Sequence, residues 1–282
     1  MLANELYKKL ESDFITSDMS DEWAIHMESV ADYLSDNFKE RSMGLVCDFA
    51  QEVNKVYTAV FPSKLVMQKI LDDGAEDSVL FVHHPSIWDI RKAPNVFYQM
   101  DRDLLERFKD NRISIFNLHV PLDAFGQYST SVTLANAIGL EIVEPFAPYH
   151  GVLCGVICKS NFKSIDELES AYSNAVGHSV NLYQNGDSNI EGLKIAVVAG
   201  GGLDEEIDSA VELGAKVFVT GITANNDHHM RAHGVAKDGH VHVLGGTHYS
   251  TEKFACMAMV EYFKKLGLDS EFIKDNPVME DM

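Results

Sequence analysis

The sequence is poor in cysteine and has no long apolar run, and each scarcity excludes a class of protein. Four cysteines among 282 residues are too few and too scattered for the disulfide framework of a secreted scaffold. Cys154 and Cys158, which share one face of a predicted strand, are better explained as buried thiols than as ligands. No apolar run approaches the roughly 20 residues that a membrane-spanning helix needs. Residues 1–10 lack the basic and then apolar order of a signal peptide, so we expect a cytoplasmic protein.

Basic residues are outnumbered, with 23 Lys and Arg against 43 Asp and Glu, which gives a formal net charge of −20. This charge opposes binding to nucleic-acid backbones and to anionic membranes, so we expect neither as a partner. It also repels a free nucleotide, unless metal cations reverse the field where the nucleotide binds. Hydrophobic residues make up 46% of the chain, which is enough for a globular protein with one large domain or two lobes.

Apolar runs with the length of strands alternate with segments of helical periodicity along most of the chain. The predicted strands are residues 53–61, 78–82, 113–118, 151–158, 194–199, 215–220 and 240–244. The predicted helices are residues 22–38, 63–73, 104–108, 129–138, 164–176, 204–213 and 250–266. Strands that alternate with helices favour an α/β fold with largely parallel pairing.

This alternation occurs in two series, which predicts two similar α/β lobes. Residues 1–43 form a predicted N-terminal helical extension, and residues 44–282 form one domain. Within that domain, one lobe takes in about 44–125 plus 245–282, and the other takes in about 126–244. The predicted exposed linkers are residues 181–191 and the acidic tail after Asp275.

Two adjacent histidines, His83 and His84, follow the predicted strand 78–82, and Pro85 then ends the strand because it has no N–H to donate. In open α/β sheets, functional groups collect beyond the carboxyl ends of strands. Two imidazoles at such a position indicate metal ligands, although an isolated pair of histidines can also be part of a turn with no ligand role.

Further downstream, His248 and Glu252 lie four residues apart where a strand meets a helix, so their side chains project from one face of that helix. Asp123 follows another strand end. Together with the histidine pair, these residues make five potential ligands, which is more than the three protein ligands of a usual catalytic zinc site. Five ligands suit two metals with a bridging carboxylate and water. Imidazole and carboxylate ligands without thiolates leave zinc, manganese and iron open.

Three segments together resemble the signatures of a known family: His83-His84-Pro85, His119-Val120-Pro121-Leu122-Asp123 and Gly246-Thr247-His248-Tyr249-Ser250-Thr251-Glu252. In order and spacing they resemble the NIF-three-like dinuclear-metal family, whose members are often labelled GTP cyclohydrolase 1 type 2. The resemblance covers roughly residues 44–266. It implies a two-lobed α/β fold, a di-metal centre in the cleft between the lobes and a ring-shaped homohexamer. By this resemblance, the metal ligands are His83, His84, Asp123, His248 and Glu252.

The chain departs from the usual family pattern at two places. Relatives usually have Glu after the Thr-Gly pair, where this chain has Ile222, and they have Thr and Asn where it has Val120-Pro121-Leu122. His119 lies outside the ligand set and is the candidate catalytic residue. An imidazole titrates near neutral pH, so it can move a proton or hydrogen-bond a metal-bound water. A packing role for His119 is the alternative.

The sequence also contains a second candidate metal site and a candidate anion site. His229 and His233 have the i, i+4 spacing of ligands on a helix, with His228 adjacent. Gly200-Gly201-Gly202 follows a strand and suits either a phosphate cradle at a helix start or close packing of the backbone. Arg231 is a nearby basic residue that could meet an anion.

Two classes of function fit these residues. In a metal-dependent hydrolase, water activated by two cations attacks an electrophilic carbon or phosphorus. The cyclohydrolase form would open the imidazole ring of GTP at C8 and release formate, whereas a phosphoesterase form would cleave a nucleotide phosphate. A metal-loaded oligomer that acts as an adaptor or regulator is the non-catalytic alternative. The expected partners are a small-molecule substrate, for instance a nucleotide, and further copies of the chain.

Overall fold

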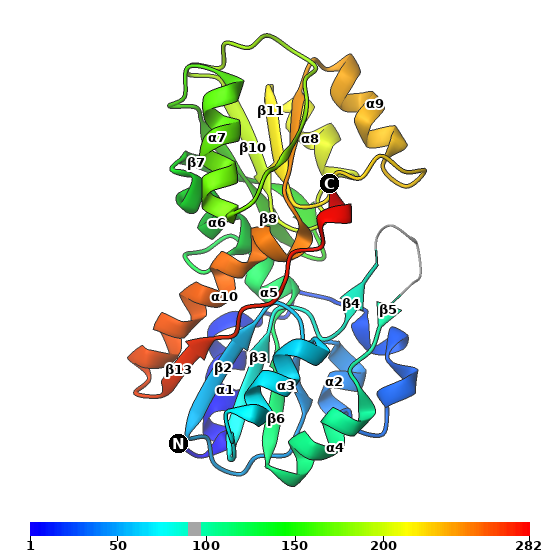
Figure 1. Cartoon of the computed structure of the whole chain (residues 1–282), viewed down its shortest axis with the longest axis vertical. Helices are drawn as coiled ribbons and strands as arrows, with labels where there is room; N and C mark the ends of the chain where they lie inside the picture. The colour runs from blue at the N-terminus through cyan, green and yellow to red at the C-terminus, as the bar shows by residue number, and fades with distance from the viewer. Residues whose placement is uncertain (90–96) are drawn as a thin grey trace. The chain divides into compact units, whose positions relative to one another are not determined.

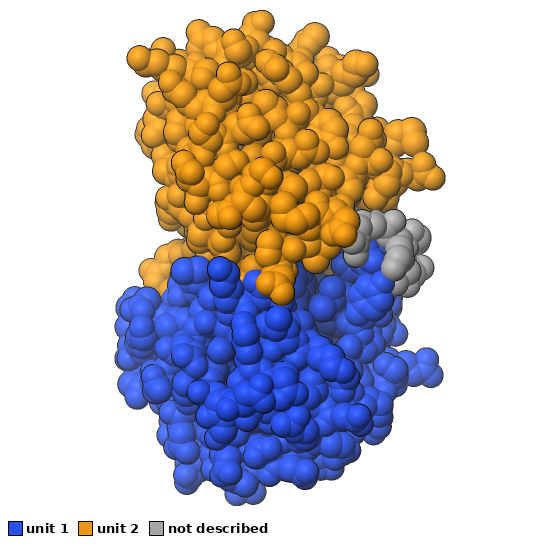
Figure 2. Space-filling model, in the orientation of Figure 1, with its two compact units in different colours: residues 1–89, 95–122, 256–275 blue, residues 90–94, 123–255, 276–282 orange. Residues whose placement is uncertain are grey.

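A computed structural model describes residues 1–89 and 97–282, which divide into two compact units (Figures 1 and 2). Among these residues, unit 1 contains Met1–Asp89, 97–122 and Cys256–Asp275, and unit 2 contains Asp123–Ala255 and Asn276–Met282. Residues 1–43, the predicted N-terminal extension, belong to unit 1. The chain passes between the units after Leu122, within helix α10 (His248–Lys265) and after Asp275.

Unit 1 is built on a five-stranded sheet with the strand order β1-β6-β3-β2-β13. Its strands are β1 (Gly44–Cys47), β2 (Lys55–Ala59), β3 (Ser78–Val82), β6 (Ile113–Asn117) and β13 (Asp269–Phe272). Neighbouring strands are parallel, except that β1 runs antiparallel to β6. Every residue of β3 and β6 is buried, as expected for central parallel strands covered on both faces. A separate short ladder pairs β4 (Ile87–Trp88) with β5 (Phe97–Tyr98).

Helices cover both faces of this sheet (Figure 1). Helices α3 (Lys64–Asp72) and α4 (Arg102–Asp110) cover one face of the sheet. Their apolar side chains form one continuous core with every second residue of the strands, those that point to that face. On the other face, Tyr7 of α1 (Ala3–Phe14) stacks on Phe116 of β6 with ring centroids 5.9 Å apart. Side chains of the central strands β3 and β6 alternate between two apolar layers, which explains why these strands are short and mostly apolar.

The predicted helix over residues 22–38 is wrong. This segment forms the 3-10 turns Trp23–His26 and Glu28–Val30, and only then the short helix α2 (Asp36–Arg41). Some of its backbone groups bond to residues outside the segment. The Ala24 N–H donates to Ser42 Oγ at 2.9 Å, and the Ser35 N–H donates to the Val46 carbonyl at 2.8 Å. Tertiary partners therefore satisfy groups that a continuous helix would have paired internally.

Unit 2 is built on a six-stranded sheet with the strand order β7-β8-β10-β11-β12-β9. Its strands are β7 (Glu141–Tyr149), β8 (Val152–Lys159), β9 (Asn181–Tyr183), β10 (Lys194–Val198), β11 (Val217–Thr220) and β12 (His242–Gly245). Only β10, β11 and β12 are parallel to one another, so this sheet is mixed rather than largely parallel. One of its three antiparallel pairs has a local cause: His150 and Gly151, with φ of 44° and 90°, form a two-residue turn that makes β7 and β8 a hairpin.

Two apolar layers also cover the sheet of unit 2. Helices α6 (Thr130–Ile138) and α7 (Ile165–Val176) share one core cluster with it, and α8 (Glu206–Glu212) and α9 (Met230–Asp238) share the other. Ser164 caps α7 as its sequence predicts, because its Oγ accepts the Glu167 N–H at 3.3 Å. Each unit thus has the α/β architecture that the sequence predicts.

Both predicted linkers contain regular structure. Residues 181–183 form strand β9, and the tail ends in the 3-10 turn Met279–Asp281, whose Asp281 is only 5% exposed. The four cysteines are free and buried. Among the residues that the structure describes, no helix is both long and apolar enough to cross a bilayer.

Candidate metal centre

Three histidines gather at the carboxyl edge of the sheet in unit 1. His83 and His84 follow β3 directly, and His119 comes two residues after β6, the parallel neighbour of β3. All three side chains are buried, and each offers one ring nitrogen that lies within 4.8 Å of the other two. Parallel strands end at the same edge of a sheet, so the predicted strand ends bring these imidazoles together.

A backbone carbonyl sets the orientation of the His83 ring. Nδ1 of His83 lies 3.0 Å from the Leu118 carbonyl oxygen, and Asn117 Nδ2 donates to the carbonyl of His83. Since a carbonyl only accepts, Nδ1 carries the proton, and Nε2 presents a lone pair. Metal-ligating histidines usually have this arrangement, in which the other ring nitrogen donates to a fixed acceptor.

Aromatic rings surround His84. Phe61 stacks on it with ring centroids 5.0 Å apart, and Trp23 meets it edge-on at 5.4 Å. The ring of His119 lies 4.7 Å from the ring of His84. These apolar walls limit the access of water to the three imidazoles and so strengthen electrostatic interactions within the cluster.

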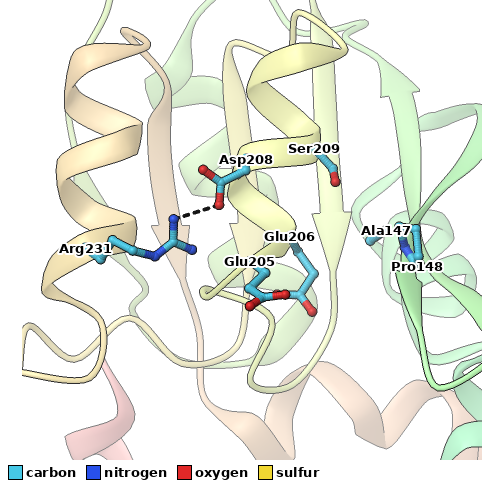
Figure 3. Close-up of a pocket in the computed structure, with 7 residues that line it drawn as sticks. All are labelled: Ala147, Pro148, Glu205, Glu206, Asp208, Ser209 and Arg231. Atoms are coloured by element: carbon cyan, nitrogen blue, oxygen red, sulfur yellow. Dashed lines mark hydrogen bonds and ion pairs between the residues drawn. The ribbon is translucent and has the colours of Figure 1, made fainter.

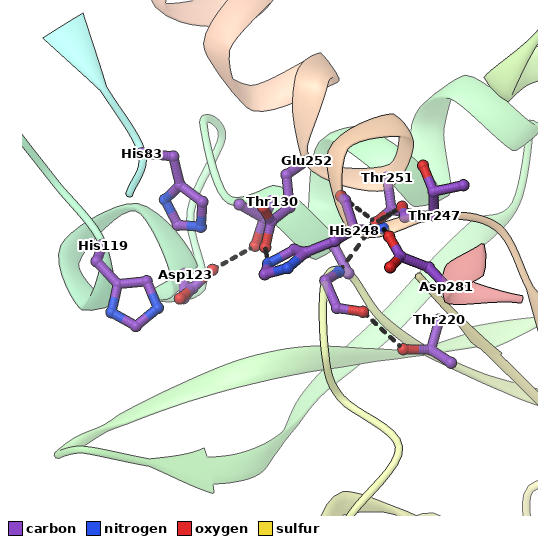
Figure 4. Close-up of polar contacts among 12 residues, drawn as sticks. His83, His119, Asp123, Thr130, Thr220, Thr247, His248, Thr251, Glu252 and Asp281 are labelled. Carbon is purple, nitrogen blue, oxygen red and sulfur yellow. Dashed lines mark hydrogen bonds and ion pairs between the residues drawn. The ribbon is translucent and has the colours of Figure 1, made fainter. Parts of the chain in front are cut away.

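The remaining predicted ligands lie in unit 2, and Figure 4 shows their side chains. His248 is the first residue of α10 and Glu252 follows one turn later, with Nε2 of the histidine 3.1 Å from Oε1 of the carboxylate. Asp123, the last residue of the single turn α5 (Val120–Asp123), is 8% exposed, and its Oδ1 accepts the Thr130 hydroxyl at 2.7 Å. Each unit, taken by itself, therefore contains buried nitrogen or carboxylate groups of the kind that bind divalent metals.

The start of α10 is held by side chains that the sequence analysis missed (Figure 4). Thr247 and Ser250 cap each other, because each hydroxyl accepts the other residue's backbone N–H, at 3.1 and 3.0 Å. The N–H of His248 donates to Asp281 Oδ2 at 3.0 Å. A carboxylate at a helix N-terminus also interacts favourably with the helix dipole. The C-terminal tail thus fixes the residue that carries a predicted ligand.

The backbone at Gly200 lies close to the His248–Glu252 pair, which is possible because glycine has no side chain. Its φ is +73°, and a Cβ on it would lie 2.2 Å from Glu252 Oε1 and 3.2 Å from His248 Nε2. Its N–H donates to Thr251 Oγ1 at 3.0 Å. Of the two roles that the sequence left open for the glycine run, the structure supports close packing of the backbone at this residue.

The rival histidines have structural partners. His229 Nδ1 donates to the Ala224 carbonyl and His233 Nε2 donates to the Thr223 carbonyl, both at 3.0 Å. Burial lowers the pKa of both histidines. Within residues 1–89 and 97–282, no group of three potential metal ligands includes them. Their bonds hold the loop before α9, which explains their spacing without a metal.

Arg231 does not offer a free positive charge in unit 2. Its guanidinium donates to Asp208 Oδ2 at 2.8 Å and to the Asp204 carbonyl at 3.0 Å, at one side of a pocket of about 390 Å³ (Figure 3). Glu205 and Glu206 also line this pocket, and burial raises the pKa of Glu206. The surplus of carboxyl groups opposes an anionic ligand here.

Comparison with known proteins places the chain in a family. The family model described as Duf34/NIF3 (NGG1p interacting factor 3) matches residues 14–277. The chain belongs to the Duf34/NIF3 family. This membership confirms the resemblance that the three motifs of the sequence predicted.

Several relatives in this family are named GTP cyclohydrolase 1 type 2 homolog. The protein from Pyrococcus horikoshii is 30% identical over 240 residues, which cover 83% of this chain and 89% of that protein. The protein from Archaeoglobus fulgidus is 28% identical over 235 residues, covering 82% and 87%. The Escherichia coli (strain K12) protein is 26% identical over 234 residues, with coverage of 82% and 87%.

Solved structures share the Duf34/NIF3 fold. The structure of reduced HcgD from Methanocaldococcus jannaschii matches with a TM-score of 0.70 at 23% identity and covers 98% of both chains. A Bacillus cereus protein related to NIF3 matches with a TM-score of 0.68 at 15% identity, covering 98% of this chain and 97% of that one.

The two departures from the family pattern lie in the apolar interior, since Ile222, Val120 and Leu122 are all buried.

Proposed function

We propose that this Duf34/NIF3 protein is a metal-dependent hydrolase in which His83, His84, Asp123, His248 and Glu252 hold two divalent cations. The observation that carries the proposal is the group of three buried imidazoles at the ends of β3 and β6. The buried His248–Glu252 pair and the buried Asp123 supply donors of the same class. Zinc, manganese and iron all accept such ligands. When bound, such cations lower the pKa of water toward neutrality and polarise a substrate oxygen.

In this proposal the protein's own residues orient the ligands and move the proton. The Leu118 carbonyl holds Nδ1 of His83, and the Thr130 hydroxyl holds Oδ1 of Asp123, so each ligand keeps its other atom for a cation. His119 accepts a proton from the attacking water and returns it to the leaving group. Its proximity to His84 supports this role.

The proposed substrate is an anionic small molecule, and GTP is the first candidate because relatives are named GTP cyclohydrolase 1 type 2 homologs. Hydrolysis at C8 of the purine would release formate. With a net charge of −20, the chain would need bound cations to attract such a substrate. Further copies of the chain, assembled as a hexamer, are the proposed partners, and light scattering tests this assembly.

Formate release from GTP tests the proposal directly. Protein loaded with zinc, manganese or iron is incubated with GTP and, in parallel, with other nucleotides and phosphodiesters. Asp123→Ala is the blank, and Asp166→Ala, at an exposed position on α7, is the matched control. Elemental analysis should find two metal ions per chain.

The other outcomes are equally decisive. Cleavage of a phosphodiester without formate release would replace the cyclohydrolase reaction with a phosphoesterase reaction. No turnover of any substrate by metal-loaded protein would favour the adaptor or regulator role. One metal or fewer at saturating concentration would contradict the dinuclear centre.

A further inference from the structure

Two side chains from the N-terminal segment meet a single ring nitrogen of His119. Trp23 Nε1 and Asp21 Oδ2 each lie 2.9 Å from Nδ1 of this histidine, although they are 96 and 98 residues away in the sequence. The contact is shielded from water, because the side chain of Asp21 is 5% exposed and that of His119 is 10% exposed. All of these residues belong to unit 1.

The two partners require opposite tautomers of His119. An indole N–H only donates, so it needs an unprotonated Nδ1, whereas a carboxylate only accepts, so it needs a proton on Nδ1. One nitrogen of a neutral ring meets only one of these requirements at a time. The hydrogen bond to the carboxylate is charge-assisted and about twice as strong as a neutral bond. An unprotonated Nδ1 would also turn its lone pair toward the negative charge of Asp21. Both effects favour the proton on Nδ1.

The backbone at Glu22 determines which oxygen of Asp21 faces the histidine. The Glu22 N–H donates to Asp21 Oδ1 at 2.8 Å, and this leaves Oδ2 beside Nδ1 of His119. An amide at position 21 would keep its oxygen at the Glu22 N–H and turn its NH₂ group toward His119. The substitution Asp21→Asn therefore converts an acceptor into a donor at this one contact while it preserves the shape of the side chain.

We propose that Asp21 is a positioning residue that selects the Nδ1–H tautomer of His119 and overrides Trp23. Nε2 is then the basic nitrogen of the ring. This inference rests on the proposed function, because it identifies Nε2 as the atom at which His119 accepts the proton. Trp23 contributes chiefly by packing, since its ring meets His84 and His119 edge-on, each with a centroid distance of 5.4 Å.

The tautomer is measured in metal-free protein by long-range proton–nitrogen correlation spectra of the histidine rings, with His119→Gln to assign the signals. The expected result is the Nδ1–H form in the unsubstituted protein and in Trp23→Phe, and the Nε2–H form in Asp21→Asn. An Nε2–H form in the unsubstituted protein, or an unchanged tautomer in Asp21→Asn, would overturn the proposal.

Turnover by the metal-loaded protein is the second measurement. Asp21→Asn should lower kcat by about 10²–10⁴-fold with KM and metal content unchanged, since a histidine held in the wrong tautomer cannot accept the proton. Asp18→Asn removes the same charge from an exposed position on the same segment and should change neither the tautomer nor kcat. An equal loss of kcat in Asp18→Asn would assign the effect to net charge and overturn the proposal. Absence of all turnover would refute the proposed function alone, because the spectra of metal-free protein still decide the tautomer.

Discussion

Replacement of Gly200 by alanine should weaken metal binding while unit 2 stays folded. The new Cβ would lie 2.2 Å from Oε1 of Glu252 and 3.1 Å from its Cδ. Ordinary contact begins near 3.4 Å, so the carboxylate must withdraw by roughly 1 Å. The side chain of Glu252 is only 4% exposed, and this withdrawal would also disturb its 3.1 Å contact with His248.

Two separate costs contribute to the expected effect. Alanine at a positive φ costs about 1–2 kcal/mol of folding stability. Disturbing the groups that orient a metal ligand lowers metal affinity by about 10–100-fold, which corresponds to about 1.4–2.7 kcal/mol. Gly214→Ala isolates the first cost, because its φ is +79° and nothing lies within 4 Å of its would-be Cβ.

The assay is a metal titration in competition with a chelator, accompanied by denaturant unfolding of both variants. Gly214→Ala should lose about 1–2 kcal/mol of unfolding free energy. Gly200→Ala should lose at least as much, because its Cβ also displaces Glu252, and only Gly200→Ala should bind metal more weakly. Equal metal affinity in the two variants would refute the reasoning, because displacement of Glu252 would then have no effect on the metal.

Three further outcomes are expected. Asp281→Ala removes the acceptor of the His248 N–H and should lower the unfolding free energy by about 0.5–2 kcal/mol; an unchanged denaturation midpoint would contradict the capping role. Burial raises the pKa of the Cys158 thiol to about 12, so it should resist alkylation near neutral pH until the protein unfolds, and rapid labelling of native protein would contradict this expectation. Burial lowers the pKa of His229 and His233 below 6.5, so the native state binds fewer protons than the unfolded chain. The unfolding free energy should therefore fall as the pH drops below about 6.5. His229→Gln should flatten this dependence in denaturant titrations, and equal slopes in the two proteins would count against it.

Some structural features escaped sequence reasoning because their local pattern was weak. Strand β7 contains Pro145 and Pro148 and exposes much of its length, so it lacks the apolar run of a central strand. It lies at the sheet edge, where proline is tolerated. Residues 22–38 have helical spacing, yet they form turns because distant groups, such as Ser42 Oγ, bind their backbone.

The sequence by itself determined which residues carry the imidazoles and carboxylates and where each of them lies within its own element. The strand before His83 can be predicted from the sequence because its apolar run and Pro85 are local features. The pairing of His248 with Glu252 is readable because four residues make about one helical turn. Such relations depend on the geometry of a few consecutive residues.

Only the tertiary structure decided which groups hold these side chains in place. Asp21 meets His119 across 98 residues, and Asp281 meets the N–H of His248 across 33. Gly200 is far from Glu252 in the sequence, yet the absence of a side chain at Gly200 leaves the space that the Glu252 carboxylate occupies. A hydrogen bond requires two atoms to be placed within a few tenths of an ångström, and no sequence period encodes such a match. It arises only when the sheets and helices of each unit pack and bring distant segments together.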